Sequence, residues 1–331
     1  MNWRDLVKKL LSALFLISSL VGYAKGFQVI TLGSDGGVID GNISGYLIRD
    51  KGEENFVALD AGTVIPGIKS ALEKNNFSGI SIPKDTEWSD TGYIFREKIK
   101  GYLISHGHLD HISGLVISST EDTKKDIYGL KSTIETLKNN VFNWKLWPNF
   151  GNEGEWFKLN QYTYQELKIS EIKNLNGTNL KVTPFSLSHS NYESTMFLLE
   201  NNGEYLAYYG DVGPDQVENS KGLEETFKVL GPLIKEKKLK AIMIESSFDS
   251  SKEDKSLFGH LTPKWIDEEF KVLERYSGEG SLKGLNVIIT HIKPSLKKND
   301  NMREKIKKEL LENNTYDVKY YFPVQGESLE F

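Results

Sequence analysis

The segment "SHGHLDHISGL", Ser105 to Leu115, holds three of the six histidines of the chain within six residues. It follows an apolar stretch that is predicted to be a strand, so it lies at a strand end, where active sites are commonly placed. Imidazoles at His106 and His108 can point at one centre from an extended loop. Asp110 and His111 then turn toward a second centre. Imidazole and carboxylate suit Zn²⁺, Mn²⁺ or Fe²⁺, and four such side chains exceed what one ion needs from one loop. The segment therefore indicates two metal ions.

Other ligand-type residues stand in similar settings along the chain. His189 and His291 each follow a predicted strand, and Asp211 follows the apolar run "YLAYYG". His260 lies in "LFGHLTPKW", just before a predicted helix. Because strand ends can gather at one edge of a sheet, these residues are candidates to complete the site begun at residues 106–111.

Short apolar strands alternate with polar helical stretches after residue 26, which is typical of an α/β domain whose sheets are covered by helices. Expected strands are 28–32, 45–49, 56–59, 101–104, 181–185, 195–199, 205–209, 241–244 and 286–290. Expected helices are 64–74, 131–139, 222–236, 263–276 and 301–313, with a break in the third at Gly231-Pro232. Thr262 and Pro263 suit the start of the fourth helix.

Composition excludes several classes of protein. The net charge of −5, from 41 basic and 46 acidic residues, argues against a nucleic acid polymer as partner. The chain has no cysteine, which rules out disulfides and thiolate chemistry. A transition metal would therefore have to be held by histidine, aspartate and glutamate.

The first 24 residues have the pattern of a secretory signal peptide. Arg4, Lys8 and Lys9 precede the uncharged stretch Leu10–Val21, and cleavage is expected after Ala24. The apolar run is too short to favour a transmembrane helix, so no stable membrane anchor is expected. An amphipathic helix of a cytosolic protein is the alternative. We expect export, to the periplasm if the source is a Gram-negative bacterium, and one domain over residues 25–331.

With these residues in place, the chain resembles the metallo-β-lactamase superfamily, whose hallmark is an H-x-H-x-D-H loop. The segment "HGHLDHISGLVISS" resembles more narrowly the signature of class II 3′,5′-cyclic-nucleotide phosphodiesterases, including Leu109. Thr120 departs from that signature, which has Ala or Pro there. The segments "LGSDGG…GNISGYLI", "WPNF" and "LFGHLTP" are also similar to that family. The resemblance covers residues 28–331.

The resemblance implies an αββα sandwich of two mixed sheets flanked by helices, and a catalytic domain that binds two divalent ions, with zinc expected. By the same resemblance, one ion is bound by His106, His108 and His189, and the other by Asp110, His111 and His291. Asp211 would bridge the two ions.

The implied reaction is hydrolysis of cyclic AMP, and of cyclic GMP as a further substrate, to 5′-nucleoside monophosphates by a hydroxide shared between the ions. His260 and Asp110 are the candidate catalytic residues, and His260 would assist the phosphate or the leaving group. The alternative for His260 is a structural histidine that donates a hydrogen bond to a metal ligand. Asp60, in "VALDAGT", matches an Asp-x-Gly element of the superfamily and would orient a ligand histidine. The alternative is another hydrolase of the same fold, acting on other phosphodiesters or lactones. A metal-binding protein without catalysis is a third possibility.

Contacts to substrate are less clearly indicated. The segment 142–157 carries six aromatic residues, and Trp144 or Trp147 would be able to stack on a base, although aromatic residues more often pack cores. Asn42, in "DGNISGY", would either bind substrate or shape its loop. The expected partner is a small cyclic nucleotide, and a homodimer is compatible with the sequence.

Overall fold

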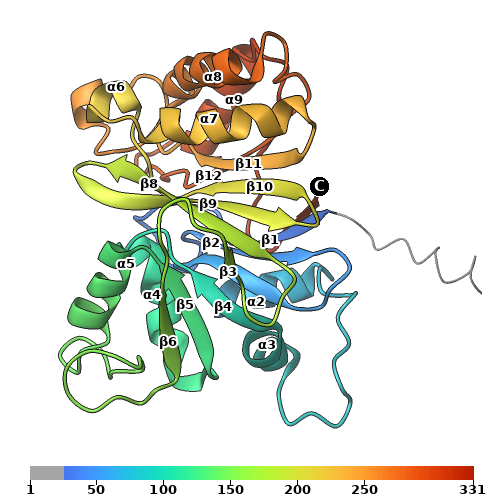
Figure 1. Cartoon of the computed structure of the whole chain (residues 1–331), viewed down its shortest axis with the longest axis vertical. Helices are drawn as coiled ribbons and strands as arrows, with labels where there is room; N and C mark the ends of the chain where they lie inside the picture. The colour runs from blue at the N-terminus through green and yellow to red at the C-terminus, as the bar shows by residue number, and fades with distance from the viewer. Residues whose placement is uncertain (1–25) are drawn as a thin grey trace, which may run out of the picture.

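The computed structural model describes residues 26–331, in which two seven-stranded sheets lie face to face (Figure 1). The predicted signal peptide, residues 1–24, lies outside the described residues. The first sheet has the strand order β14-β1-β2-β3-β4-β5-β6. Its strands are β1 (Phe27–Gly33), β2 (Gly45–Asp50), β3 (Phe56–Ala61), β4 (Ile99–Leu103), β5 (Lys125–Gly129), β6 (Tyr162–Glu166) and β14 (Ser328–Glu330).

The second sheet has the order β13-β12-β11-β10-β9-β8-β7. Its strands are β7 (Lys173–Asn174), β8 (Lys181–His189), β9 (Tyr192–Asn201), β10 (Glu204–Tyr209), β11 (Leu239–Glu245), β12 (Asn286–Thr290) and β13 (Lys319–Tyr321). Both sheets are mixed. Strands β1 to β3 and β8 to β10 pair antiparallel, whereas β3 to β6 and β10 to β13 pair parallel.

Helices cover the outer face of each sheet, as Figure 1 shows. They are α2 (Ile65–Glu73), α3 (Asp90–Tyr93), α4 (Leu109–Ser118) and α5 (Lys131–Thr136) beside the first sheet, and α6 (Asp215–Glu218), α7 (Gly222–Lys235), α8 (Pro263–Ser277) and α9 (Met302–Glu312) beside the second. The expected αββα sandwich is therefore confirmed. Among the described residues, no helix combines the length and apolar character needed to span a bilayer.

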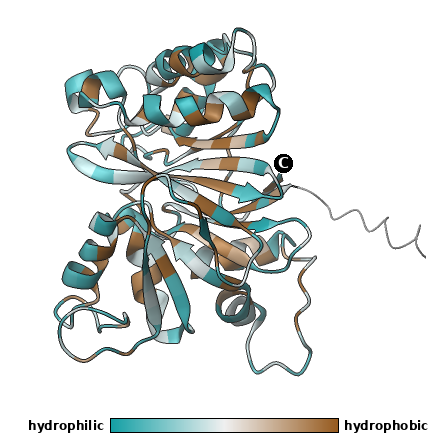
Figure 2. Ribbon diagram, in the orientation of Figure 1, coloured by the Kyte–Doolittle hydropathy of each residue, from teal (hydrophilic) through white to brown (hydrophobic). Residues whose placement is uncertain are grey.

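Three apolar clusters hold these layers together. One lies between the sheets, with Phe197 and Tyr208 from one side meeting Tyr46 and Leu59 from the other. A second joins the first sheet to α2 and α4, and a third joins the second sheet to α7 and α8. In Figure 2 the hydrophobic colour accordingly follows the strands and the inward faces of the helices. Burial of apolar area is the main favourable term for such packing.

The five predicted helices are present, with a difference at one proline, whereas α3, α4 and α6 were not among the predicted helices. Helix α8 begins as expected, with Thr262 accepting a hydrogen bond from the Trp265 backbone N–H and Pro263 in the first turn. The break predicted at Gly231-Pro232 is wrong, because α7 continues through Pro232 to Lys235. Gly231 packs so closely on Tyr276 that a Cβ would lie 2.7 Å from its backbone carbonyl carbon. The close packing of Gly231 against α8 thus favours continuation of helix α7 beyond Pro232.

The strand ends define the place of the functional site. Parallel pairing aligns β10, β11 and β12, with Tyr208 opposite Met243 and Glu245 opposite Thr290. The residues that follow these strands, Asp211 and His291 among them, are thereby brought to one edge of the second sheet. The strand β4 of the first sheet ends at Leu103 and leads into the histidine-rich loop at the same edge of the sandwich (Figure 1).

Candidate metal centre

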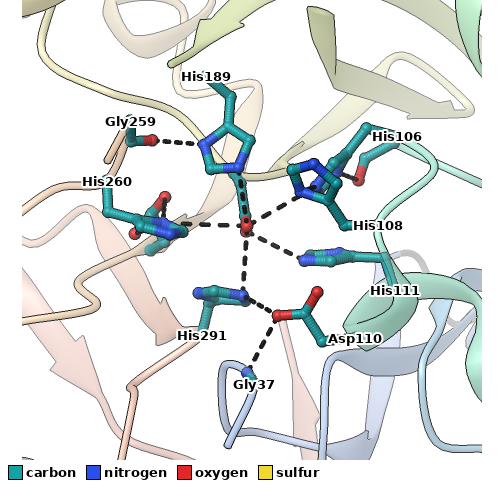
Figure 3. Close-up of polar contacts among 12 residues, drawn as sticks. Gly37, His106, His108, Asp110, His111, His189, Gly259, His260 and His291 are labelled. Carbon is teal, nitrogen blue, oxygen red and sulfur yellow. Dashed lines mark hydrogen bonds and ion pairs between the residues drawn. The ribbon is translucent and has the colours of Figure 1, made fainter. Parts of the chain in front are cut away.

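The labelled histidines of Figure 3 face one shared centre, and the distances identify the carboxylate at that centre as Asp211. The distances from Asp211 Oδ2 to the Nε2 atoms of three histidines are 3.3 Å for His291, 3.7 Å for His189 and 3.8 Å for His106. His111 Nε2 lies 3.2 Å from the other oxygen, Oδ1. Three groups of possible metal ligands share Asp211. One adds His106, His108 and His189, the second adds Asp110, His111 and His291, and the third adds Glu245, His260 and His291.

The histidine-rich loop is shaped by the start of α4 and by close backbone packing. His108 is the last extended residue before the helix, and Asp110 lies in its first turn. A Cβ on Gly62, directly after β3, would lie 1.9 Å from the Asp110 carbonyl oxygen. This position therefore requires glycine, because the end of β3 presses directly on the ligand-bearing turn.

The donor atoms of the centre fit cations. His111 Nε2 and Asp211 Oδ1 are both buried and have no hydrogen-bond partner among the described residues. The Nδ1–H of His111 donates to Asp60 Oδ2 over 2.7 Å, so in the neutral ring Nε2 is a lone-pair acceptor. Two buried acceptors that face each other need a positive charge between them. Nitrogen and carboxylate donors without sulfur fit a divalent transition metal.

Hydrogen bonds outside the centre orient the histidine rings. Nδ1 of His189 lies 2.7 Å from the Gly259 carbonyl, and Nδ1 of His291 lies 2.8 Å from Ser247 Oγ. Each contact leaves Nε2 free to face Asp211. Outer partners of this kind fix the tautomer of metal-binding histidines.

Asp60, which the sequence predicted to orient a ligand histidine, lies against His111. In addition to His111, its carboxylate accepts hydrogen bonds from the Ser105 backbone N–H, the Ser105 hydroxyl and the Tyr208 hydroxyl, at 2.6–2.8 Å. Its backbone is in the left-handed region, with φ 51°. Such conformations at buried non-glycine residues mark sites where surrounding contacts hold a strained geometry. Asp60 thus connects β3, the histidine loop and β10.

The electrostatics of the centre favour an ionised carboxylate at Asp211 and neutral imidazoles at His106, His108 and His291, but a protonated ring at His111. Burial lowers the pKa of His106, of His108 and of His291. For Asp211, burial raises the pKa, but the charges of His111 and His291 outweigh it and hold the pKa well below the usual range. For His111, burial is outweighed by Asp211 and Asp60, and its pKa is raised. Neutral imidazole and ionised carboxylate are the forms that bind metals.

His260 also lies in the centre, and its partner is a residue that the sequence did not indicate. His260 Nδ1 lies 2.9 Å from Glu245 Oε1, and its ring stacks on His291 with centroids 5.1 Å apart. Burial lowers the pKa of His260 to about 4, and burial with the charge of Asp211 raises the pKa of Glu245 to about 7. Glu245 ends the apolar strand β11. An acidic residue in that position is the sequence feature that would have made Glu245 a candidate site residue.

The remaining candidates have structural contacts. The Asn42 side chain accepts from the Ser34 N–H at 3.2 Å and donates to Asp35 at 2.8 Å, which shapes its own loop. The Trp147 indole N–H donates to Ser119 Oγ, and its ring packs against the core beside α4. A role for Trp147 or Trp144 in base stacking stays a prediction.

The comparison with known proteins places the chain in a family. Residues 26–326 match the family model described as class-II cAMP phosphodiesterases. The chain belongs to this family. A 3′,5′-cyclic-nucleotide phosphodiesterase of Aliivibrio fischeri is 47% identical over 98% of this chain and 99% of the relative. A probable 3′,5′-cyclic-nucleotide phosphodiesterase of Yersinia pestis is 44% identical over 96% of this chain and 92% of the relative. The identification from the "HGHLDHISGLVISS" segment is confirmed, and the phosphodiesterase prediction is supported over the alternative hydrolases.

Solved structures support the same fold. Unliganded yeast PDE1 matches with a TM-score of 0.77 and 24% identity, over 93% of this chain and all of that chain. The metallo-β-lactamase fold protein YhfI from Bacillus subtilis matches with a TM-score of 0.58 and 16% identity, over 93% of this chain and all of that chain. These matches establish the metallo-β-lactamase fold of this member of the family.

Proposed function

We propose that this protein hydrolyses 3′,5′-cyclic nucleotides, cyclic AMP and also cyclic GMP, to 5′-nucleoside monophosphates at a site for two divalent metal ions. The observation that carries the proposal is Asp211, whose carboxylate is common to all three groups of possible ligand side chains, two of which correspond to the two proposed ions. Membership of the class-II family, together with relatives of the same named activity, supports the substrate.

The ligands would divide between the two ions. His106, His108 and His189 would bind one ion, Asp110, His111 and His291 would bind the other, and Asp211 would contact both. When bound, two such ions supply a nucleophile from water at neutral pH and neutralise charge on the phosphoryl group. We propose that the ions are zinc, because imidazole and carboxylate ligands in small clusters suit it.

The chain supplies His260 for the leaving oxygen. Glu245 holds Nδ1 of His260, and no hydrogen bond from another residue in the range 26–331 reaches Nε2. Nε2 of the neutral ring is therefore the atom that would take up the proton released by the attacking water and pass it to the 3′ oxygen of the substrate as its bond to phosphorus breaks, which leaves the ring neutral again. A carboxylate behind the imidazole stabilises the protonated ring during this transfer, as in other acid–base pairs.

Two further groups lie at the open side of the centre. The Asp110 side chain is 17% exposed, and its Oδ2 accepts from the Gly37 N–H at 3.0 Å and lies 3.2 Å from His291 Nε2. Its carboxylate would accept a hydrogen bond from the attacking water and orient it. Lys293 has no ion-pair partner in the part of the chain that the structure describes, and its positive charge adds to burial in lowering the pKa of His260. Its ammonium would contact a phosphate oxygen.

Three finer proposals concern the protein in the cell. The pattern of residues 1–24 supports export to the periplasm after cleavage behind Ala24. The negative net charge supports a small cyclic nucleotide as partner in place of a nucleic acid polymer. A homodimer remains compatible with the sequence, and sedimentation of the purified protein would test it.

The test of function is an assay of metal-loaded protein against four substrates: cyclic AMP, cyclic GMP, bis(p-nitrophenyl) phosphate and a lactone. We expect rapid hydrolysis of cyclic nucleotides to 5′-monophosphates and its loss with chelator. Elemental analysis of the same samples tests zinc and the count of two ions. Hydrolysis of the lactone with neither cyclic nucleotide cleaved would contradict the proposal.

A further inference from the structure

Three apolar side chains are exposed beside the metal centre. Leu109 lies between two ligand residues of the histidine loop and is 68% exposed, while Val38 and Ile39, in the loop between β1 and β2, are 61% and 47% exposed. We call these three residues the apolar shelf. Exposed apolar side chains that are grouped mark ligand sites, whereas single ones do not, and these three line one cavity.

The loop that carries Val38 and Ile39 is fixed to the centre by hydrogen bonds. The Gly37 N–H donates to Asp110 Oδ2 over 3.0 Å, and the Gly36 N–H donates to the Ile292 carbonyl, also over 3.0 Å. Gly36 also lies against the ring of His291, where a Cβ would come within 2.5 Å. The loop is thereby held at the ligands of one proposed ion.

Outside these contacts the loop is braced and locally strained. Arg303 bonds Asp35 at 2.9 Å, and Asn42 bonds the same carboxylate. Val38 has φ 82°, a conformation that is a true outlier for a β-branched residue. Strain of this kind persists where surrounding contacts impose it, commonly at ligand-binding positions. Asn42 therefore supports the shelf through its loop.

A cavity is lined by the three shelf residues and reaches the centre at Asp110. Its volume is about 360 Å³, within the range of small-molecule sites. It is lined by Gly37, Val38, Ile39, Asp40, Ile43, Leu109, Asp110 and Ser113. The lining is apolar with a few polar groups, and one of them, Asp110, belongs to the metal centre. A ligand in this cavity would therefore reach Asp110, a proposed ligand of one ion.

We propose that the apolar shelf binds the purine base of the substrate, with the cyclic phosphate at the metal centre. This inference rests on the proposed function. A purine has two flat apolar faces and a polar edge. One face would lie on Leu109, Val38 and Ile39, and Asp40 and Ser113 would be near the edge. A larger cavity of about 660 Å³, along β8, β9 and α7, contains none of the proposed ligands in its lining, so it is less suited to a base whose phosphate is at the centre.

The test compares two shelf variants, Leu109→Ser and Ile39→Ser, with the control Ile117→Ser. Ile117 is 67% exposed on α4, the helix that begins at Leu109, and does not line the cavity. Two substrates are used: cyclic AMP, and the base-free analogue methyl riboside 3′,5′-cyclic phosphate. We expect each shelf variant to lower kcat/KM for cyclic AMP roughly tenfold through KM, as loss of one apolar contact typically does. The base-free analogue should be cleaved by wild type and shelf variants at similar kcat/KM, and Ile117→Ser should behave as wild type.

Each other result overturns the inference. If both shelf variants cleave cyclic AMP as wild type does, the base binds elsewhere, for instance along β8 and α7. If both substrates lose activity equally, the shelf supports the centre and not the base. Failure of the proposed function is distinct, because metal-loaded wild type would then leave cyclic AMP and the base-free analogue uncleaved.

Discussion

The two halves of the sandwich supply the metal centre in different ways. The first sheet contributes His106, His108, Asp110 and His111 from one loop and the first turn of α4. The second sheet contributes one residue at a time, from the ends of β8, β10 and β12 and the loop before α8. A compact loop fixes its ligands through local geometry. Dispersed ligands depend on strand pairing over the whole sheet. Asp211, placed by such pairing, contacts the histidines of the compact loop.

The largest effect is expected at Asp211, which side chains from both sheets approach. Asp211→Asn should lower turnover of cyclic AMP by roughly a thousandfold or more, since loss of an outer partner of a metal ligand already costs about 10–100-fold. Elemental analysis should find fewer ions bound per chain. Asp317→Asn, at an exposed carboxylate, is the control. Full activity in Asp211→Asn would mean that the two ligand groups do not share this residue.

A second test concerns a pair that lies wholly in the second half. His260→Ala should reduce kcat by roughly 10²- to 10⁴-fold, the range for general acid–base groups, with metal content unchanged. Glu245→Gln should also reduce kcat, by a smaller factor than His260→Ala. Measurement of kcat together with bound metal separates the outcomes, because loss of metal from His260→Ala would make this residue a ligand and contradict the proposed role.

The third test compares two buried carboxylates on the side of the first sheet: Asp60, which contacts the histidine loop, and Asp122, which lies away from the centre. Asp60→Asn should weaken metal binding by about 10–100-fold, because one amide oxygen cannot accept all the donors that converge on the carboxylate. Competition with a chromogenic chelator measures the affinity. Asp122→Asn is a matched control, since Asp122 is also buried and accepts from Tyr102 and Tyr162 outside the centre. Equal metal affinities in the two variants would contradict a role for Asp60 in metal binding.

The smallest expected effect is a pH dependence of stability in the second half, away from the ligands. Burial, with the charge of Asp215, raises the pKa of Glu269 on α8 to about 7. The folded state therefore binds more protons than the unfolded state above pH of about 4.5, and this contribution to stability is lost as the pH rises from about 4.5 to about 7. The loss is at most about 3 kcal/mol.

Denaturant unfolding at pH 5 and pH 8, compared with Glu269→Gln, measures this effect. The amide keeps the acceptor for the Asp215 backbone N–H, which Glu269 accepts at 3.1 Å, and does not ionise. The variant should therefore gain stability relative to wild type at pH 8 and not at pH 5. An equal change at both pH values would assign the effect to packing.

The sequence predicted the two halves unequally for physical reasons. His106 to His111 are recognisable because their spacing is short and local. His189, Asp211 and His291 were found because each follows an apolar strand, although only the resemblance arranged them around two ions. Glu245 was missed, since its partner His260 is brought to it by the fold. Strands β5 and β6 were missed as well, because "KDIYG" and "YTYQE" carry many polar residues, and burial of Lys125 depends on its distant tertiary setting.

Asp211 and the surrounding ligands come from both sheets, so an ion bound there would cross-link the two layers of the sandwich. Ligands that bind only the folded chain stabilise it by mass action, by about 2.7 kcal/mol at a hundredfold excess over the dissociation constant. Metal-free protein would then unfold more often at this edge, while the core between the sheets holds the rest together. The supply of metal would set the lifetime of the protein against proteases that attack open states, as well as its rate of catalysis.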